Sequence, residues 1–161
     1  MSDIAVVTGA SGGIGAAVAR TMHQKSAGQL KLCLHYNGNK AAAESVSKDI
    51  PGSFIVSADL STAAGRKTLL DAVLAQGTPF VLVNNAGIDR PHEPALMIDE
   101  ASYDKILSTN LKAPLFLMRD FAKEMARGEA GVIVNISSVL ARKAVVGSAL
   151  YRASKAALEA L

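Results

Sequence analysis

The stretch that decides the fold runs from residue 4 to residue 15 and reads Ile4-Ala5-Val6-Val7-Thr8-Gly9-Ala10-Ser11-Gly12-Gly13-Ile14-Gly15. It joins a short apolar strand to a helix whose apolar positions recur at helical spacing from residue 14 to residue 22. Glycines allow a tight turn and bring backbone N–H groups against a pyrophosphate, which the helix N-terminus also attracts. A flexible turn that binds nothing is the alternative, but the flanking strand and helix favour a binding turn.

Strand and helix patterns alternate through the rest of the chain, as a parallel α/β sheet requires. The patterns predict strands at 4–7, 30–36, 53–57, 80–83 and 131–136. They predict helices at 14–22, 41–49, 62–76 and 99–127, and a last helix from about residue 149 that is still running at residue 161. Repeats, low-complexity tracts and linkers are absent, so we expect a single domain over residues 1–161.

Composition excludes several classes of protein. The 161 residues are 50% hydrophobic, which is typical of a globular chain, and apolar runs of membrane-spanning length are absent. The start, Met1-Ser2-Asp3, lacks a basic segment, so a signal peptide is not expected. A net charge of +3 with 4% aromatic residues does not favour nucleic-acid binding.

Cysteine and histidine usage gives two further expectations. The single cysteine, Cys33, excludes an internal disulfide and is expected as a buried thiol in a reducing cytoplasm. His23, His35 and His92 lack ligand spacing, so they are interpreted as isolated surface or loop histidines and no metal site is predicted.

Each predicted strand ends in polar or glycine-rich residues, although the strands themselves are apolar. In open α/β sheets, ligands bind outside the carboxyl ends of the strands. Plain turn chemistry accounts for some of these ends, but all of them together predict a ligand site. In chain order the ends are Thr8-Gly9, Asn37, Asp59, Asn84-Asn85-Ala86-Gly87 and Ser137-Ser138.

Near the C-terminal end, Tyr151 and Lys155 lie four residues apart in a stretch of good helix formers, so they share one helix face. A phenol has a pKa near ~10, and a neighbouring ammonium group favours the phenolate. The pair is therefore a candidate acid–base unit. Ordinary helix surface is the alternative for such a pair taken alone.

Asn110 precedes Pro114 by four residues inside the predicted helix 99–127. Proline has no N–H to donate to the Asn110 carbonyl, and its ring crowds that carbonyl. The sequence predicts a kinked helix with a free carbonyl at Asn110, and a tolerated kink without function is the alternative.

Four motifs in this order resemble the classical short-chain dehydrogenase/reductase family, most closely 3-oxoacyl-[acyl-carrier-protein] reductases. They are Thr8-Gly9-x-x-x-Gly13-x-Gly15, Asn84-Asn85-Ala86-Gly87, a serine thirteen residues before the tyrosine, and Tyr151-x-x-x-Lys155. The resemblance implies a Rossmann-type doubly wound parallel sheet with strand order 3-2-1-4-5. Family members continue beyond this point, so it also implies that the last strands and most of the substrate lid are missing and that the isolated fragment is inactive.

The resemblance also implies roles for single residues. Tyr151 would protonate the carbonyl oxygen, Lys155 would lower the tyrosine pKa and bind the nicotinamide ribose, and Ser138 would hydrogen-bond the reacting oxygen, with Ser137 as the alternative. The Asn110 carbonyl would hold a relay water. Asp59 would contact adenine, although a turn or helix-cap role is compatible with its position. The expected cofactor-binding residues are Gly9, Ser11, Gly12, Gly13, Ile14, Gly15, Tyr36, Asn37, Asp59, Leu60, Asn85, Ala86, Gly87, Tyr151 and Lys155.

The end of the second strand bears on cofactor choice. NAD sites usually carry an acidic residue there, whereas residues 35–40 contain none and Lys40 could approach a 2′-phosphate. NADP (NADPH) is therefore favoured over NAD, although position 12 is glycine where many NADP-dependent relatives are basic. The resemblance further implies a cytoplasmic homotetramer acting on a small-molecule or carrier-protein-bound carbonyl. A non-catalytic dinucleotide-binding sensor or scaffold is the competing function.

Overall fold

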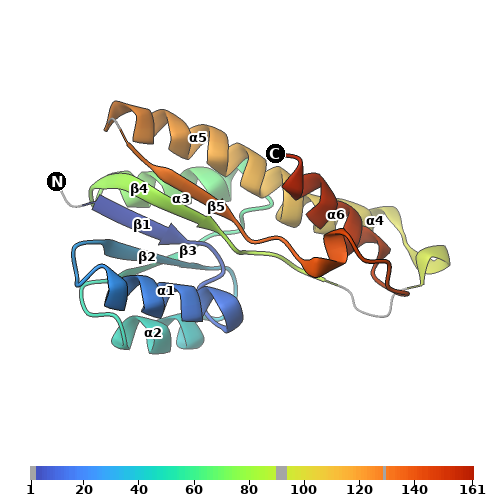
Figure 1. Ribbon diagram of the computed structural model, residues 1–161, viewed down its shortest axis with the longest axis horizontal. Coiled ribbons are helices and arrows are strands. Elements are labelled where there is room, and N and C mark those ends of the chain that lie inside the picture. The colour runs from blue at the N-terminus through green and yellow to red at the C-terminus, as the bar shows by residue number, and fades with distance from the viewer. Residues whose placement is uncertain (1–2, 90–93, 129) are drawn as a thin grey trace.

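A parallel sheet of five strands forms the centre of the computed structural model, which describes residues 3–89, 94–128 and 130–161 (Figure 1). Met1, Ser2 and His92 lie outside the described residues. The strands lie in the order β3-β2-β1-β4-β5, which confirms the predicted fold class and topology. Their bounds are β1 (Asp3–Val7), β2 (Lys31–Tyr36), β3 (Phe54–Ser57), β4 (Thr78–Asn84) and β5 (Val132–Asn135).

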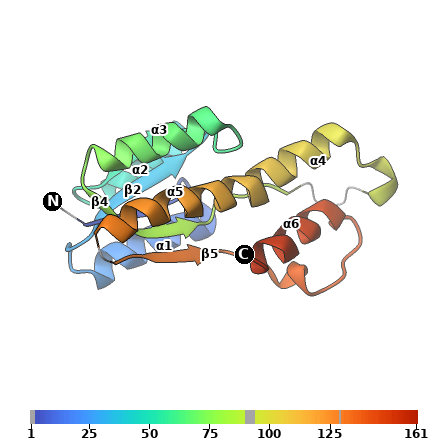
Figure 2. The same ribbon diagram turned by 90° about the horizontal axis from the view of Figure 1, so that it is seen from above.

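Helices cover both faces of this sheet (Figures 1 and 2). One face is covered by α1 (Gly13–Lys25) and α2 (Lys40–Lys48), and the other by α3 (Ala63–Leu74) and α5 (Ala113–Arg127). Side chains of β1 alternate between the two cores: Ile4 and Val6 pack toward Leu69 and Phe121, while Ala5 and Val7 join the core under α1 and α2. This alternation is the two-residue period of a strand buried on both faces.

The predicted helix at 99–127 contains an irregular turn. It consists of α4 (Glu100–Leu107), a π-helical turn at Ser108–Lys112, and α5. The N–H of Ala113 donates to the carbonyl of Ser108, five residues back. Pro114 stands at the start of α5, where its missing N–H costs least. The disturbance predicted at the proline is thus present, in the form of a π turn.

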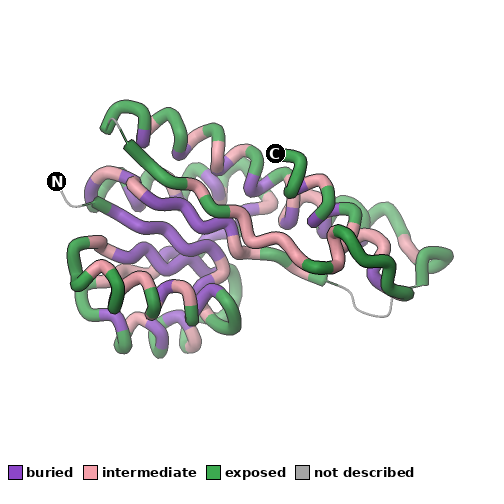
Figure 3. The backbone as a smooth tube through the Cα atoms, in the orientation of Figure 1, coloured by how far each residue is buried: buried purple, intermediate pink, exposed green. Residues whose placement is uncertain are grey.

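The C-terminal helix α6 (Ala149–Glu159) packs against α4 and the π turn beyond the carboxyl edge of the sheet (Figure 2). It ends at Glu159, so the prediction that it still runs at residue 161 is wrong. Among the described strands β5 is an edge, and Val132 and Val134 are exposed on it (Figure 3). Short 3₁₀ turns lie at Ala95–Met97 and Val139–Ala141.

Two further observations concern membrane-spanning helices and the single cysteine. None of the helices in the described residues has the length and apolar character needed to cross a membrane. Cys33 is fully buried in β2, as predicted, and burial raises the pKa of its thiol far above the usual range.

Candidate functional site

The glycine turn after β1 owes its shape to two close approaches of backbone. Gly9 has φ +66°, and a Cβ there would lie 3.0 Å from the Cα of Ala86. A Cβ on Gly15 would lie 2.3 Å from the carbonyl oxygen of Gly9. Both positions therefore require glycine, the second because α1 packs directly on the turn. Gly13 has φ +53°, and neither Gly13 nor Gly15 lines the cavity described below.

Thr8 and Asn85 lock this turn to the end of β4. The Oγ1 of Thr8 accepts hydrogen bonds from the N–H groups of Asn85 and Ala86, both at 2.9 Å. The Nδ2 of Asn85 donates to the carbonyls of Thr8 at 2.8 Å and Gly9 at 3.1 Å. Asn85 thus shapes the wall through its side chain. Thr8 stood in the motif but not among the predicted site residues.

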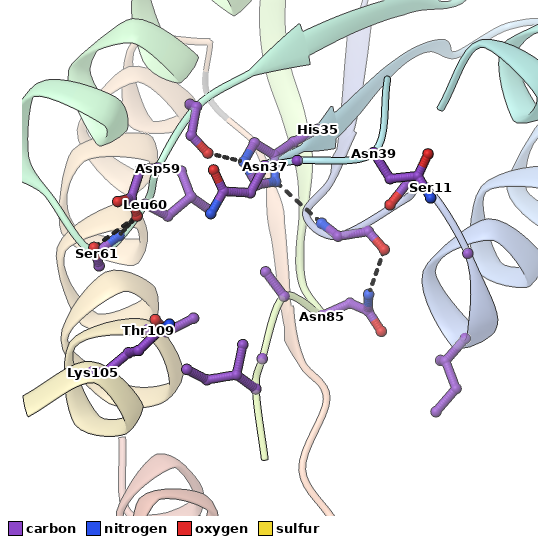
Figure 4. A pocket seen from close by; sticks show the side chains of 18 residues that line it. Ser11, His35, Asn37, Asn39, Asp59, Leu60, Ser61, Asn85, Lys105 and Thr109 are labelled. Carbon is purple, nitrogen blue, oxygen red and sulfur yellow. Dashed lines mark hydrogen bonds between the residues drawn. The ribbon is translucent and has the colours of Figure 1, made fainter. Parts of the chain in front are cut away.

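An open cavity of about 700 Å³ lies at this edge of the sheet, within the usual size range of small-molecule sites (Figure 4). Many predicted cofactor residues line it, but the buried Tyr36 does not, and neither do Tyr151 and Lys155. Predicted residues in the lining are Gly9, Ser11, Gly12, Ile14, Asn37, Asp59, Leu60, Asn85, Ala86 and Gly87. The lining also includes residues that sequence reasoning missed: His35, Gly38, Asn39, Ala58, Ser61, Ile88, Lys105 and Thr109.

The N-terminus of α1 opens beside this cavity and fits an anionic group. Its N-cap residue is Gly12, which has extended backbone and no side chain to satisfy the first N–H groups of the helix. Gly12 and Ile14 both line the cavity. A pyrophosphate placed there would receive the uncapped N–H groups and the positive end of the helix dipole.

The end of β2 differs in one respect from the sequence interpretation. Asn37, Gly38 and Asn39 line the cavity without a carboxylate, but Lys40 does not line it. Instead Lys40 lies 3.4 Å from Glu44 in an exposed ion pair on α2. The Oδ1 of Asn39 accepts the N–H of Ala42 and caps the same helix. The direct support for a 2′-phosphate is therefore the missing acid rather than a lysine in the lining.

Asp59 shapes a turn and also lines the cavity. Its Oδ1 accepts from the N–H of Ser61 at 3.0 Å and from the Ser61 hydroxyl at 2.7 Å, so it shapes the turn after β3. The N-cap of α3 is Thr62. Because Asp59 also lines the cavity, its turn role and a contact to adenine are compatible.

His35 is buried in β2, which contradicts the interpretation of the histidines as surface or loop residues. Its Nδ1 lies 3.1 Å from the N–H nitrogen of Gly9, and its Nε2 lies 2.9 Å from the carbonyl oxygen of Ala58. Sequence spacing does not reveal these contacts, since both partners are more than twenty residues away. In the described residues, clusters of side chains suited to a metal ion are absent.

Lys155 is held at the carboxyl end of β5 by its own ammonium group. Only 3% of the residue is exposed, and Nζ donates to the carbonyl of Ile136 at 2.7 Å. Nζ lies 5.8 Å from the centre of the Tyr151 ring, so the two side chains share one face of α6 as predicted. Burial lowers the pKa of Lys155. A Cβ on Gly87 would lie 3.6 Å from Nζ, which places the ammonium beside the cavity wall.

The two candidate serines have different neighbours. The Oγ of Ser138 accepts the N–H of Leu140 and caps the short turn that follows. The Oγ of Ser137 donates to Glu159, at the far end of α6 from Tyr151. Since Ser137 is directed to the other end of the helix, this geometry agrees with the preference for Ser138, whose catalytic role stays a prediction.

The side chain of Asn110 makes contacts that the sequence analysis did not foresee. Asn110 is fully buried, and its Oδ1 accepts the N–H of Ile88 while its Nδ2 donates to the Ile88 carbonyl, both at 2.8 Å. Nδ2 also lies 3.1 Å from the hydroxyl of Ser154 on α6. Asn110 therefore joins the cavity wall to the helix that carries Tyr151 and Lys155.

A comparison with protein families matches residues 3–161 to the family described as short chain dehydrogenase. The match covers nearly the whole chain, in agreement with the strand order and the motif positions. The chain belongs to the short-chain dehydrogenase family.

This short-chain dehydrogenase chain is similar in sequence to proteins with different names. It is 36% identical over 97% of its length to a short-chain type dehydrogenase/reductase of Picea abies. It is 34% identical, again over 97% of its length, to the 3-oxoacyl-[acyl-carrier-protein] reductase FabG of Staphylococcus aureus. It spans 61% of the first relative and 64% of the second.

Solved structures give the same family. A metagenomic short-chain oxidoreductase in complex with NADP superposes with a TM-score of 0.89 at 36% identity, covering 98% of this chain and 72% of that one. Acetoin dehydrogenase from Enterobacter cloacae superposes with a TM-score of 0.90 at 25% identity, covering 99% of this chain and 64% of that one.

Proposed function

We propose that the protein containing this chain is an NADP-dependent oxidoreductase that interconverts a carbonyl group and a secondary alcohol. The observation that carries this proposal is the position of Lys155. Its ammonium group is anchored at the end of β5, shares a helix face with Tyr151 and lies beside Gly87 in the wall of the cavity. The ammonium group of the proposed proton-transfer pair thus lies behind the wall of a cavity suited to a dinucleotide.

The chemistry divides between the cofactor and the chain. When bound, the nicotinamide supplies or accepts the hydride. The chain's own residues would then manage the proton: Tyr151 donates it to the carbonyl oxygen during reduction, and the Lys155 ammonium favours the phenolate that is left. Ser138 would hydrogen-bond the same oxygen. Asn110 would keep α6 at its distance from the cavity wall.

NADP is the proposed cofactor because the lining at the end of β2 lacks a carboxylate. Asn37, Gly38 and Asn39 would leave a 2′-phosphate unrepelled. The NADP complex of the related metagenomic oxidoreductase supports the same choice.

A 3-oxoacyl group on acyl-carrier protein is the favoured substrate class, supported by the relatives named FabG. The basic pair Arg142-Lys143 precedes Tyr151, although Arg142 is already 2.9 Å from Glu159. By the same family argument we propose a homotetramer assembled through α5 and α6. Light scattering on the full-length protein tests this assembly, and a strictly monomeric species would contradict it.

The decisive test of the proposed function is Tyr151→Phe in the full-length protein. The ring stays and only the hydroxyl is lost, so carbonyl reduction should fall at least ~100-fold while NADPH affinity is nearly unchanged. Turnover and cofactor binding are measured on the same preparation, with Tyr103→Phe, an exposed tyrosine on α4, as the matched control. Near-normal turnover in Tyr151→Phe would contradict the proposed role of Tyr151, whereas a wild-type protein that binds NADPH without turnover would favour the sensor or scaffold function.

A further inference from the structure

His35 connects two walls of the cavity, and its two hydrogen bonds determine which ring nitrogen carries the proton. The N–H of Gly9 is a donor, so the Nδ1 that faces it at 3.1 Å must be an unprotonated acceptor. The carbonyl of Ala58 is an acceptor, so the Nε2 that faces it at 2.9 Å must carry the proton. His35 is 2% exposed, so water does not replace either partner readily (Figure 4).

These two contacts join the two loops that line the cavity on either side of β2, the glycine turn and the loop after β3. Gly9 begins the glycine turn in a left-handed conformation, and Ala58 immediately precedes Asp59. The backbone of His35 adds a third tie, because its carbonyl accepts the N–H of Ala10 at 2.8 Å. One residue of β2 therefore sets the spacing between the turn that would hold the pyrophosphate and the loop that would hold adenine.

We infer that His35 is a positioning residue for the dinucleotide: its neutral ring holds the glycine turn against the Asp59 loop, and protonation of Nδ1 releases the turn. The inference rests on the proposed function, since it assumes that the cavity binds a dinucleotide. A protonated Nδ1 would present an N–H to the N–H of Gly9, and two donors cannot bond. The expected consequence is weaker cofactor binding in acid.

The electrostatic surroundings of the ring agree with a neutral form at pH 7. Burial is the largest influence and lowers the pKa of His35, while the hydrogen bond to Ala58 and the negative charge of Asp59 oppose that shift. Asp59 is the charged group that faces the ring from the loop after β3, and residues 8–12 of the glycine turn carry no titratable side chain. Free histidine titrates at about 6.5, so the folded ring takes up a proton only below that value.

The sign of the pH effect follows. At pH above about 6.5 the ring is neutral in the folded and the unfolded chain, and the contribution of His35 to stability is fully present. As the pH falls through that value, the unfolded chain binds the proton before the folded chain does. The stability contribution of His35 is therefore lost progressively as the pH falls from about 6.5 to the lower folded pKa. Cofactor affinity depends on the protonation of the folded ring alone, so it should fall as the pH drops through the lowered folded pKa.

The experiment is a titration of NADP⁺ against the full-length protein from pH 8 to pH 5, by calorimetry. Three variants separate the contacts. His35→Asn places an oxygen acceptor near Nδ1 but does not titrate, and His35→Gln reaches toward Ala58 but removes the acceptor for Gly9. His23→Asn changes a partly exposed histidine on α1 and serves as the control.

Wild type and His23→Asn should lose about tenfold more affinity between pH 8 and pH 5 than His35→Asn, since one hydrogen bond to a buried donor is at stake. His35→Gln should bind about tenfold more weakly at pH 8. Titration of the NADP⁺ phosphate affects all the proteins equally, so only the difference from His35→Asn counts.

A pH dependence in His35→Asn equal to that of wild type would overturn the inference. NMR of the wild-type ring gives an independent reading, because an Nδ1-protonated neutral tautomer at pH 8 would also overturn it. Absence of NADP⁺ binding by wild type at pH 8 would instead contradict the proposed function.

Discussion

The two halves of the cavity edge are built in different ways. In the dinucleotide half, backbone groups of the glycine turn, the end of β4 and the loop after β3 bond to one another through Thr8, Asn85 and His35. In the catalytic half, residues 142–146 are exposed, and α6 is attached through side chains, among them Lys155, Asn110 and Glu159. Loss of one contact in the dinucleotide half should therefore weaken cofactor binding, whereas loss of one of these side chains in the catalytic half should mainly remove turnover. Substitutions can test this contrast.

Lys155→Met should give the largest effect, and it acts on the catalytic half. Turnover should fall about a thousandfold, the scale of a lost acid–base contribution, and NADPH affinity should fall as well. The melting temperature should change little, because an apolar chain of similar length replaces a desolvated ammonium whose pKa burial has already lowered. Activity assays and calorimetry on the full-length protein measure the three quantities. Lys143→Met, an exposed lysine, is the control, and a retained turnover in Lys155→Met would break the contrast.

Gly15→Ala tests the dinucleotide half by crowding. The new Cβ would lie 2.3 Å from the Gly9 carbonyl, so α1 must move away from the turn, at a cost of about 3 kcal/mol in unfolding free energy. Gly12→Ala is the matched control, because a Cβ there meets nothing within 4 Å and its φ of −179° suits alanine. Urea denaturation compares the two variants. Equal stability would mean that the turn is less closely packed than described.

Asn110→Ala separates a side-chain role from a carbonyl role. If only the backbone carbonyl mattered, the substitution would be mild. The structure instead predicts a loss of about 2 kcal/mol, because the partly buried N–H and carbonyl of Ile88 both lose their partner. The free energy of unfolding, measured by denaturation, and the turnover should fall together. Lys112→Ala, at an exposed position in the same π turn, should resemble wild type in both. A stable and active Asn110→Ala would restore the carbonyl interpretation.

Asn37→Asp should have the smallest effect and should act on cofactor choice. A carboxylate at the end of β2 would repel a 2′-phosphate and accept from a 2′-hydroxyl. The ratio of kcat/KM with NADPH to that with NADH should fall about tenfold, equivalent to ~1.4 kcal/mol. Steady-state kinetics with both cofactors measure it. A wild-type protein that already uses NADH as efficiently as NADPH would contradict the proposed preference.

Local patterns in the sequence predicted the parts of the molecule that depend on local geometry. Glycine spacing and strand ends located the turn at Gly9 and the loop at Asp59, because turn chemistry depends on adjacent residues. Helical spacing paired Tyr151 with Lys155 for the same reason. The strand order followed from the family resemblance, and the structure confirms it.

The remaining features depend on partners far apart in the chain. His35 contacts groups 26 and 23 residues away, and Asn110 contacts a helix 44 residues away, so a one-dimensional pattern does not contain them. From its position after β2, the sequence suggested that Lys40 could approach a 2′-phosphate. In the structure Lys40 instead forms an ion pair with Glu44 on its own helix.

The π turn at Ser108–Lys112 has a consequence for insertions and deletions. Buried positions from α4 to α5 follow a spacing of about four residues, through Ser102, Ile106, Asn110, Pro114, Leu117, Phe121 and Met125. In a regular α-helix each four-residue step drifts by ~40°, and one additional residue in a turn absorbs ~100° of that drift. From Ser102 to Met125 the drift of a regular α-helix would reach ~140°, and the π turn reduces it to ~40°, so both residues lie on one side of a long helix. Removing a single residue from it would rotate the whole of α5 relative to α4, a change of phase that no point substitution in this segment can produce.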